Sequence, residues 1–353
     1  MKVTEVKTFL VHAVRQNWLF VKIETDTGLA GWGEASVEAQ EHAVAACIDT
    51  LAKRSVIGED PLNISKIWRQ MYHQGFWRGG FIHMSAISGI DQALWDIAGK
   101  HYGVPVYMLL GGNVRNKLKC YTHAQTGEEA RHLCHDLGFS GVKCCYRYGK
   151  LEAALRDIRE AIGPDKEIYV DQHGQIPAAL SADQMKAAAK YGVTFFEEPV
   201  GPENIEEYKL IRQNSFGLRI AGGERMYSRF EMRPLIENQL VDYIQPDVCH
   251  CGGISEIMRI ASYAEAYHIM FAPHNPNGPV ATAASMQVAA AAHNFALLEF
   301  WSGVLNRTDI FDLDLTITDG YFKIPTKPGL GIEIHEELLA QYPFQDTQYI
   351  CRS

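Results

Sequence analysis

The chain has 353 residues, 47% of them hydrophobic, and carries a formal net charge of −9 at pH 7. A chain of this size and composition buries a substantial core, which excludes disorder as its main state. The acidic balance argues against nucleic acid as a partner, because surfaces that bind nucleic acid depend on clustered Lys and Arg.

The apolar pattern and the cysteines exclude further classes of protein. No apolar run reaches the roughly 18 residues of a membrane span, and the N-terminus lacks the continuous apolar stretch of a secretion signal. We therefore predict a soluble cytoplasmic protein with no membrane partner. The eight cysteines are spread along the chain, which is typical of reduced thiols. Cys249-His250-Cys251 is spaced too closely for a structural zinc site.

Residues 1–116 are predicted to form an α+β domain. Leu19, Val21 and Ile23 occupy alternate positions before the turn residues 25–28, which indicates a β-hairpin or short meander. From about residue 37 to 110 the apolar residues fall at spacings of three and four, most clearly between Ala86 and Ile97. Strands followed by helices are typical of the α+β class.

Residues 117–325 repeat a different unit, in which a short apolar run ends in a polar residue and a helical stretch follows. These polar residues recur at intervals of 23–28 residues and are Lys143, Asp171, Glu197, Glu224, Asp247, His274 and Glu299. With residues 119–122 as a first strand, the pattern predicts an α/β fold, a (β/α)7-8 TIM-type barrel capped by the N-terminal domain. Residues 326–353 are predicted to pack back on the cap.

The polar residues that end the strands are expected to meet at one rim, where barrel enzymes place their catalytic groups. Asp171, Glu197 and Glu224 follow consecutive strands, and carboxylates so close together need a cation to stay ionised. Oxygen ligands favour Mg²⁺, with Mn²⁺ as a substitute, over zinc. Either Glu197 or Glu198 can point into the mouth, because neighbouring strand residues face opposite sides. We predict Glu197 as the ligand and Glu198 as its support.

Several motifs resemble the mandelate racemase subgroup of the enolase superfamily over nearly the whole chain. They are Gly31-Trp32-Gly33-Glu34, Asp171-Gln172-His173, Phe196-Glu197-Glu198-Pro199, Gly223-Glu224-Arg225, Gln245-Pro246-Asp247, Ala272-Pro273-His274 and Lys327-Pro328-Gly329. Within the subgroup the sequence is most similar to galactonate dehydratases and related acid-sugar dehydratases. The resemblance implies a Mg²⁺-dependent dehydratase that removes the α-proton of an aldonate such as galactonate. An enediolate forms, the 3-hydroxyl departs, and a 2-keto-3-deoxy acid results.

The resemblance and the chemistry together suggest roles for the remaining rim residues. His274 paired with Asp247 is the candidate base, and His173, which matches the dehydratase motif, is the candidate acid. Lys143 supplies a cation to the developing charge. Glu299 either accepts a hydrogen bond or, if protonated, steadies the enediolate.

Contacts with the rest of the substrate are expected from four side chains. Trp18, Trp77 and Arg78 belong to the cap, and Arg225 follows a metal ligand. The family also implies a homo-oligomer that acts on a small molecule.

Two alternatives stay open at this point. The first is a racemase or epimerase, although such relatives carry Lys-x-Lys where this chain has Lys143-Cys144-Cys145. Cys145 is either inert packing or an ionised thiol beside Lys143. The second alternative is a sugar-acid-binding relative without catalysis.

Overall fold

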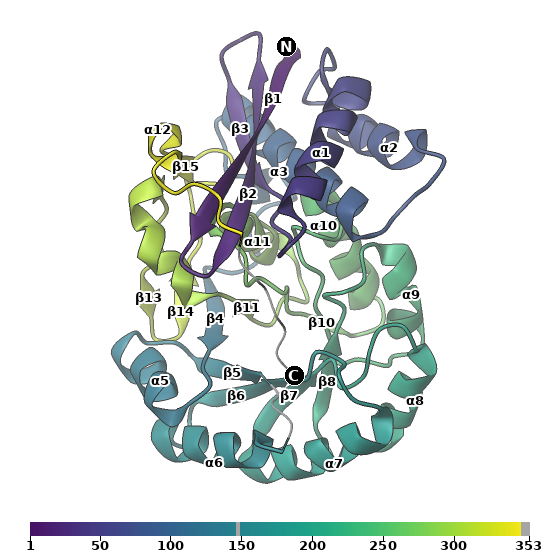
Figure 1. Cartoon of the computed structure of the whole chain (residues 1–353), viewed down its shortest axis with the longest axis vertical. Helices are drawn as coiled ribbons and strands as arrows, with labels where there is room; N and C mark the ends of the chain where they lie inside the picture. The colour runs from purple at the N-terminus through teal and green to yellow at the C-terminus, as the bar shows by residue number, and fades with distance from the viewer. Residues whose placement is uncertain (146–148, 347–353) are drawn as a thin grey trace.

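The structure is a computed structural model that describes residues 1–145 and 149–346. Its N-terminal domain begins with a three-stranded antiparallel sheet in the order β1 (Val3–Ala13), β2 (Gln16–Thr25) and β3 (Ala30–Glu34). Val14 and Arg15 form the tight turn between the first two strands, with Val14 at a φ of 60°. Figure 1 shows this sheet above the rest of the molecule.

The helices of this domain follow the sheet in the chain, and the first and third of them pack against its strands. These helices are α1 (Glu41–Leu51) with its π-helical extension η1 (Ala52–Val56), α2 (Ile64–Gln74), α3 (Phe81–Tyr102) and α4 (Val106–Leu109). Helix α3 packs directly on β3, because Gly31 and Gly33 bring the strand against the helix backbone at Ala93 and Gly89. A side chain at either glycine would collide with that backbone. The Gly-Trp-Gly pattern therefore sets the distance between sheet and helix.

The second domain is a closed barrel of parallel strands. The strands are β4 (Lys117–His123), β5 (Gly141–Cys145), β6 (Glu167–Asp171), β7 (Val193–Glu197), β8 (Arg219–Gly222), β9 (Tyr243–Ile244), β10 (Met270–Phe271) and β11 (Leu298–Glu299). They pair in sequence order from β4 to β10, and β11 pairs with β4. A parallel bridge between Phe271 and Phe295 completes the ring. The predicted barrel with an α+β cap is confirmed.

Helices between successive strands surround the barrel. They are α5 (Gly127–Arg131) with η2 (His132–Asp136), α6 (Leu151–Ile162), α7 (Ala178–Ala188) with η3 (Ala189–Tyr191), α8 (Ile205–Gln213), α9 (Arg229–Glu237), α10 (Gly253–Glu265) and α11 (Pro279–Ala291). The barrel interior is filled by aromatic rings, with Tyr121, Tyr169 and Phe195 fully buried. Because side chains fill the interior, the active groups must lie at its rim.

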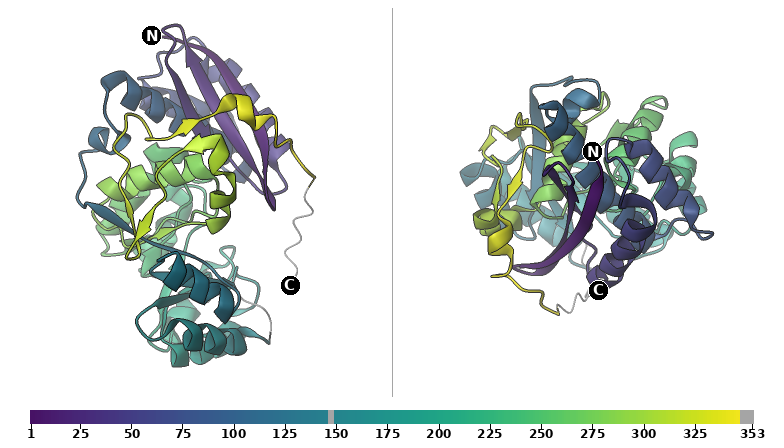
Figure 2. Two further views of the ribbon diagram at one scale, coloured as in Figure 1. Left: turned by 90° about the vertical axis from the view of Figure 1, so that its left-hand side faces the viewer. Right: turned by 90° about the horizontal axis from the view of Figure 1, so that it is seen from above.

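The chain then leaves the barrel through the 3-10 stretch η4 (Ser302–Ile310). Short elements follow, namely β12 (Phe311–Asp312), β13 (Ile317–Thr318), β14 (Tyr321–Lys323), β15 (Glu333–Ile334) and α12 (Glu336–Leu339). The hairpin of β13 and β14 pairs with barrel strand β4. The backbone N–H of His12 donates to Tyr342, and Lys22 forms an ion pair with Glu336. Residues 336–346 thus lie along β1 and β2, as Figure 2 shows, whereas the predicted packing of residues 347–353 on the cap lies outside the described residues.

The cap also grips the barrel directly. Glu34, at the end of β3, accepts hydrogen bonds from the backbone N–H groups of Gly278 and Ala281 at the start of α11. These contacts fix the loop that leads from β10 into α11. Among the described residues, no helix combines the length and the hydropathy needed to cross a bilayer.

Candidate active site and metal centre

A cavity of about 360 Å³ lies between the cap and the carboxyl ends of the barrel strands. The cap contributes Arg15, Gln16, Val37, Glu38 and Phe81 to its lining. The barrel contributes His123, Lys143, Cys145, Asp171, His173, Glu224, Arg225, Tyr227, His250, His274 and Pro276. Most of the lining residues are therefore of polar or titratable types, the exceptions being Val37, Phe81 and Pro276.

Three buried carboxylates from neighbouring strands meet at the rim. Asp171 ends β6, Glu197 ends β7 and Glu224 follows β8, and each offers an oxygen within 4.8 Å of the others. Burial and the charge of Asp171 raise the pKa of Glu197 well above its usual value. Burial opposes ionisation of Asp171 too, but His173 and Lys143 outweigh it and hold its pKa well below the usual value.

This donor set fits a hard divalent cation. All three ligands are carboxylate oxygens, as Mg²⁺ and Mn²⁺ prefer. A cation among them would offset the burial and the repulsion from Asp171 that together raise the pKa of Glu197. The cluster can therefore hold a divalent metal ion.

The structure separates the roles of the two adjacent glutamates. Glu198 does not belong to the carboxylate donor group and is held by Arg225, whose Nε lies 2.9 Å from Oε2 of Glu198. The same guanidinium donates from Nη2 to the backbone oxygen of His173 at 2.8 Å. Burial and Glu224 raise the pKa of Glu198 to about 8 despite Arg225. Arg225 therefore links the loops that follow β6 and β7 by hydrogen bonds, and it also lines the cavity.

Lys143 on β5 is buried among acidic groups. Its Nζ lies 3.1 Å from Asp171, 3.2 Å from Glu197 and 2.5 Å from Glu299. Burial lowers the pKa of Lys143, but these carboxylates outweigh it and raise the pKa well above the usual value. The side chain is thus a fixed positive charge beside the carboxylate cluster.

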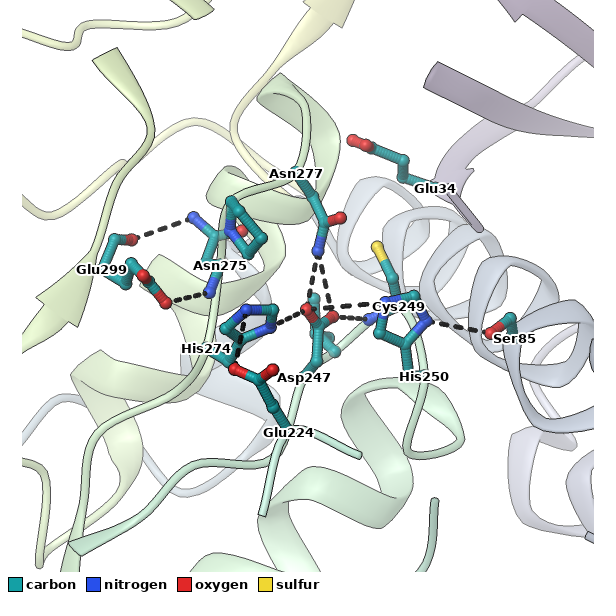
Figure 3. A network of polar contacts seen from close by, with 12 residues as sticks. Glu34, Ser85, Glu224, Asp247, Cys249, His250, His274, Asn275, Asn277 and Glu299 are labelled. Carbon is teal, nitrogen blue, oxygen red and sulfur yellow. Dashed lines mark hydrogen bonds and ion pairs between the residues drawn. The ribbon is translucent and has the colours of Figure 1, made fainter. Parts of the chain in front are cut away.

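His274, which follows β10, is held by Asp247, which follows β9. Nδ1 of His274 lies 2.7 Å from Oδ2 of Asp247, and Asn277 donates to both oxygens of that carboxylate (Figure 3). The other ring nitrogen of His274 lies 3.1 Å from Glu224. Burial opposes the imidazolium, but Glu224 and Glu299 outweigh it and raise the pKa of His274 well above its usual value.

His173 lies two residues beyond Asp171. Its Nε2 is 3.0 Å from Oδ2 of Asp171, and its backbone N–H donates to Oδ1 at 3.0 Å. The residue adopts a φ of 52°, which turns the chain sharply back towards the ligand. Asp171 raises the pKa of His173 to about 9. Because β6 and β10 are four strands apart in a ring of eight, His173 and His274 stand on opposite sides of the mouth.

The sequence analysis missed His123, the last residue of β4. It lies in the cavity wall, and its Nε2 is 2.6 Å from Oε1 of Glu299. Burial lowers the pKa of His123, so the neutral ring donates to Glu299. Burial also opposes ionisation of Glu299, but Lys143 and His274 outweigh it and lower its pKa. Glu299 is therefore a carboxylate, not the protonated acid that was considered.

The three residues of the cap that were predicted to contact the substrate do not line the cavity. Trp18 is fully buried beside Phe20 and does not line the cavity, because its position in β2 directs it into the core. Trp77 is 83% exposed, and neither it nor Arg78 belongs to the lining. Arg15 and Gln16, from the turn that precedes Trp18, reach the cavity instead.

The histidine of the Cys-His-Cys sequence also lies in the cavity wall. Nδ1 of His250 is 3.0 Å from Oγ of Ser85, while Cys249 and Cys251 are fully buried. The two cysteines do not belong to either donor group that the described residues offer to a metal.

Comparison with known proteins places this fold and site in a family. Residues 3–111 match the mandelate racemase / muconate lactonizing enzyme N-terminal domain, and residues 125–338 match the enolase C-terminal domain-like family. The chain is 40% identical to D-galactonate dehydratase of Pectobacterium atrosepticum, over 97% of this chain and 94% of that protein. It is 39% identical to D-galactonate dehydratase of Variovorax paradoxus, over 96% and 93% of the two chains.

Solved structures with the same fold include other members of the superfamily. A putative dehydratase from Mesorhizobium loti superposes with a TM-score of 0.90 at 31% identity, covering 98% of this chain and 99% of that one. The 3,6-anhydro-D-galactonate cycloisomerase from Zobellia galactanivorans superposes with a TM-score of 0.91 at 29% identity, covering 98% and 100%.

Proposed function

The chain belongs to the mandelate racemase / muconate lactonizing enzyme family of the enolase superfamily, and we propose that it is a Mg²⁺-dependent sugar-acid dehydratase. The substrate is an aldonate such as galactonate, and the product is a 2-keto-3-deoxy acid. The observation that carries this proposal is the placement of His173 and His274 on opposite sides of a carboxylate cluster. Dehydration needs a base at one carbon and an acid at the next.

His274 acts as the base that removes the α-proton. Its Nδ1 is bonded to Asp247, so the α-proton is taken up at Nε2, and a cation bound to Glu224 would reduce the attraction that otherwise keeps this nitrogen protonated. Asp247 keeps its own charge, because Asn277 and the backbone N–H of Cys249 both donate to it. A fixed carboxylate stabilises the imidazolium that forms on proton transfer.

Removal of the α-proton adds negative charge to the substrate carboxylate. A Mg²⁺ ion bound by Asp171, Glu197 and Glu224 would supply positive charge there as it develops. Lys143 adds a second positive charge that is already in place and needs no rearrangement. Glu299 holds this ammonium and also accepts a hydrogen bond from His123.

His173 acts as the acid that protonates the departing 3-hydroxyl. The attraction of Asp171 keeps the ring protonated at neutral pH, with a pKa of about 9. The side chain is 35% exposed to the cavity, so it can reach a substrate group. A hydroxide leaves slowly unless it is protonated as it departs.

Arg15 and Glu38 contact the far end of the sugar acid. The guanidinium of Arg15 stacks over Trp301 at 5.1 Å and forms no ion pair among the described residues. It is therefore free to donate hydrogen bonds to hydroxyl groups, whereas Glu38 can accept them. The neighbouring Gln16 donates to the backbone of Pro276 and so fastens the cap to the barrel loop.

Racemisation by two bases is disfavoured by the second strand. The position two residues beyond Lys143 is Cys145, where racemases carry their second lysine. Burial raises the pKa of Cys145 to about 12, so the thiol does not serve as a base at neutral pH.

A screen of aldonic, aldaric and uronic acids with Mg²⁺ tests the function. We expect semicarbazide to detect a 2-keto acid from an aldonate. Stereochemical inversion without keto acid would instead identify an epimerase, and binding without any turnover would identify a sugar-acid-binding relative.

A further inference from the structure

A second group of metal-binding donors adjoins the carboxylate cluster. Cys145, Asp171 and His173 each offer one donor atom, and these atoms lie within 4.8 Å of one another. The arrangement follows from the barrel, because Cys145 at the end of β5 is in register with Asp171 at the end of β6. The left-handed backbone of His173 turns the chain back, so that its side chain lies beside Cys145 and Asp171.

This group differs from the carboxylate cluster in its chemistry. It combines a sulfur, a nitrogen and an oxygen, which is the donor set that Zn²⁺ prefers and Mg²⁺ does not. Three protein ligands with one open position are typical of zinc sites that face a cavity. Cys145 and His173 both line the cavity, so an ion can enter from solvent.

Cys145 is distinguished from the other cysteines by its surroundings. Of the free cysteines in the described ranges, Cys47 and Cys145 alone are partly exposed, and Cys47 belongs to no such donor group. The adjacent Cys144 is buried in the core, where it faces away from the cavity. A soft metal ion that enters the cavity therefore finds one cysteine thiol in its lining, that of Cys145.

We propose that Cys145, Asp171 and His173 form a binding site for a soft divalent cation such as Zn²⁺, distinct from the hard-cation site and sharing only Asp171 with it. On binding, a sulfur–zinc bond replaces the S–H bond of Cys145, a nitrogen–zinc bond replaces an N–H bond of the His173 imidazolium, and both protons pass to solvent. Burial and Asp171 favour the protonated thiol of Cys145. Because this proton must be lost, the affinity for Zn²⁺ is lower than it would be at an exposed site.

Occupation of this site would inhibit the enzyme. The metal would be coordinated by His173, the proposed acid, and by Asp171, a proposed Mg²⁺ ligand. We expect Zn²⁺ to inhibit even when Mg²⁺ is in excess. This consequence rests on the proposed function, whereas metal binding itself does not.

Titration with Co²⁺ tests the site without any substrate. Cobalt bound to a thiolate has a charge-transfer band in the near ultraviolet, and cobalt bound by carboxylates alone lacks it. We expect the band in the wild-type protein at one equivalent of cobalt. It should be lost in Cys145→Ser, weakened in His173→Asn and kept in Cys144→Ala, the matched control at the neighbouring cysteine. Circular dichroism checks that each variant is folded.

Three results would overturn the site. They are the absence of the band in the wild type, its survival in Cys145→Ser, and its equal loss in the Cys144 and Cys145 variants. If the band is absent while Mg²⁺ still restores keto-acid formation, the proposed function stands and this site alone is rejected. If keto-acid formation fails while the band behaves as expected, the metal site stands and the proposed function is rejected.

Discussion

His274 and Asp247 form a hydrogen bond of 2.7 Å between Nδ1 and Oδ2 at the mouth of the barrel. The pair directs the other ring nitrogen of His274 towards the carboxylate cluster, 3.1 Å from Glu224. Asp247→Asn keeps the shape of the side chain but removes the charge that stabilises the imidazolium. We expect kcat for keto-acid formation to fall by about 10²–10⁴-fold. The affinity for Mg²⁺, measured by calorimetry, should change little. An unchanged kcat would show that Asp247 does not support His274 as the base.

The acid and base roles can be separated by isotope exchange. In His173→Asn the base is intact, so the α-proton should still exchange with deuterium while dehydration falls by about 10²–10⁴-fold. In His274→Asn both exchange and dehydration should be lost. NMR of the recovered substrate measures exchange, and a keto-acid assay measures dehydration. If His173→Asn abolished exchange and His274→Asn did not, the two roles would be reversed.

The pH dependence of turnover follows from the charge on His173. The ring must be protonated to donate, and the protonated form is lost as pH rises through its pKa. Asp171 raises that pKa to about 9 in the metal-free protein. A cation on Asp171 weakens the attraction, so we expect kcat to decline on the alkaline side at or below that pH. An alkaline decline that survives in the residual activity of His173→Asn would assign the titration to another group.

Arg15 and Arg78 provide a matched test of the cap. Arg15 lines the cavity and Arg78 does not. Loss of hydrogen bonds from a charged group to a substrate costs about 1.5–3 kcal/mol, so Arg15→Met should raise KM by at least about tenfold. Arg78→Met should leave KM within about twofold of the wild-type value, because no contact with the substrate is removed. Equal effects of the two substitutions would contradict the assignment, and steady-state kinetics decides between these outcomes.

The tie between Arg225 and Glu198 predicts a loss of stability. Arg225→Met leaves a buried carboxyl group without its hydrogen-bond donors, which costs about 1–3 kcal/mol for a buried polar group. Because the side chain of Arg225 is 36% exposed, we expect about 1–2 kcal/mol in urea unfolding at neutral pH.

Arg233→Met serves as the control for that measurement. Arg233 and Glu237 lie 4.0 Å apart at the surface, with 63% and 46% of their side chains exposed. Such a pair contributes less than about 1 kcal/mol. Equal losses in the two variants would show that the buried position of Glu198 has no special effect.

The rim residues could be predicted from sequence because each closes a repeated unit. Asp171, Glu197 and Glu224 follow consecutive strands, and a barrel brings consecutive strand ends together whatever its details. His123 was missed because the residue that ends β4 was taken to be Thr122, one position too early. The length of a strand depends on its partners, and β4 is paired on both sides by β5 and β11.

The cap contacts could not be predicted in the same way. Whether Trp18 or Arg15 reaches the mouth depends on how β1 and β2 lie over the barrel, and that placement is set by distant contacts such as Glu34 with the start of α11. The register of the hairpin pairs Trp18 with Val11 and turns it into the core. An exposed turn of polar residues carries no periodic signal that marks it as part of a site.

The most direct test of the central claim is the rate of keto-acid formation from galactonate, or from the acid that the screen identifies, before and after exhaustive chelation. If Asp171, Glu197 and Glu224 share a hard divalent cation, the chelated enzyme should be inactive and added Mg²⁺ or Mn²⁺ should restore the full rate. Glu197→Gln should require far more Mg²⁺ for half-maximal activity than the wild type. Undiminished turnover by the chelated wild-type protein would contradict the account.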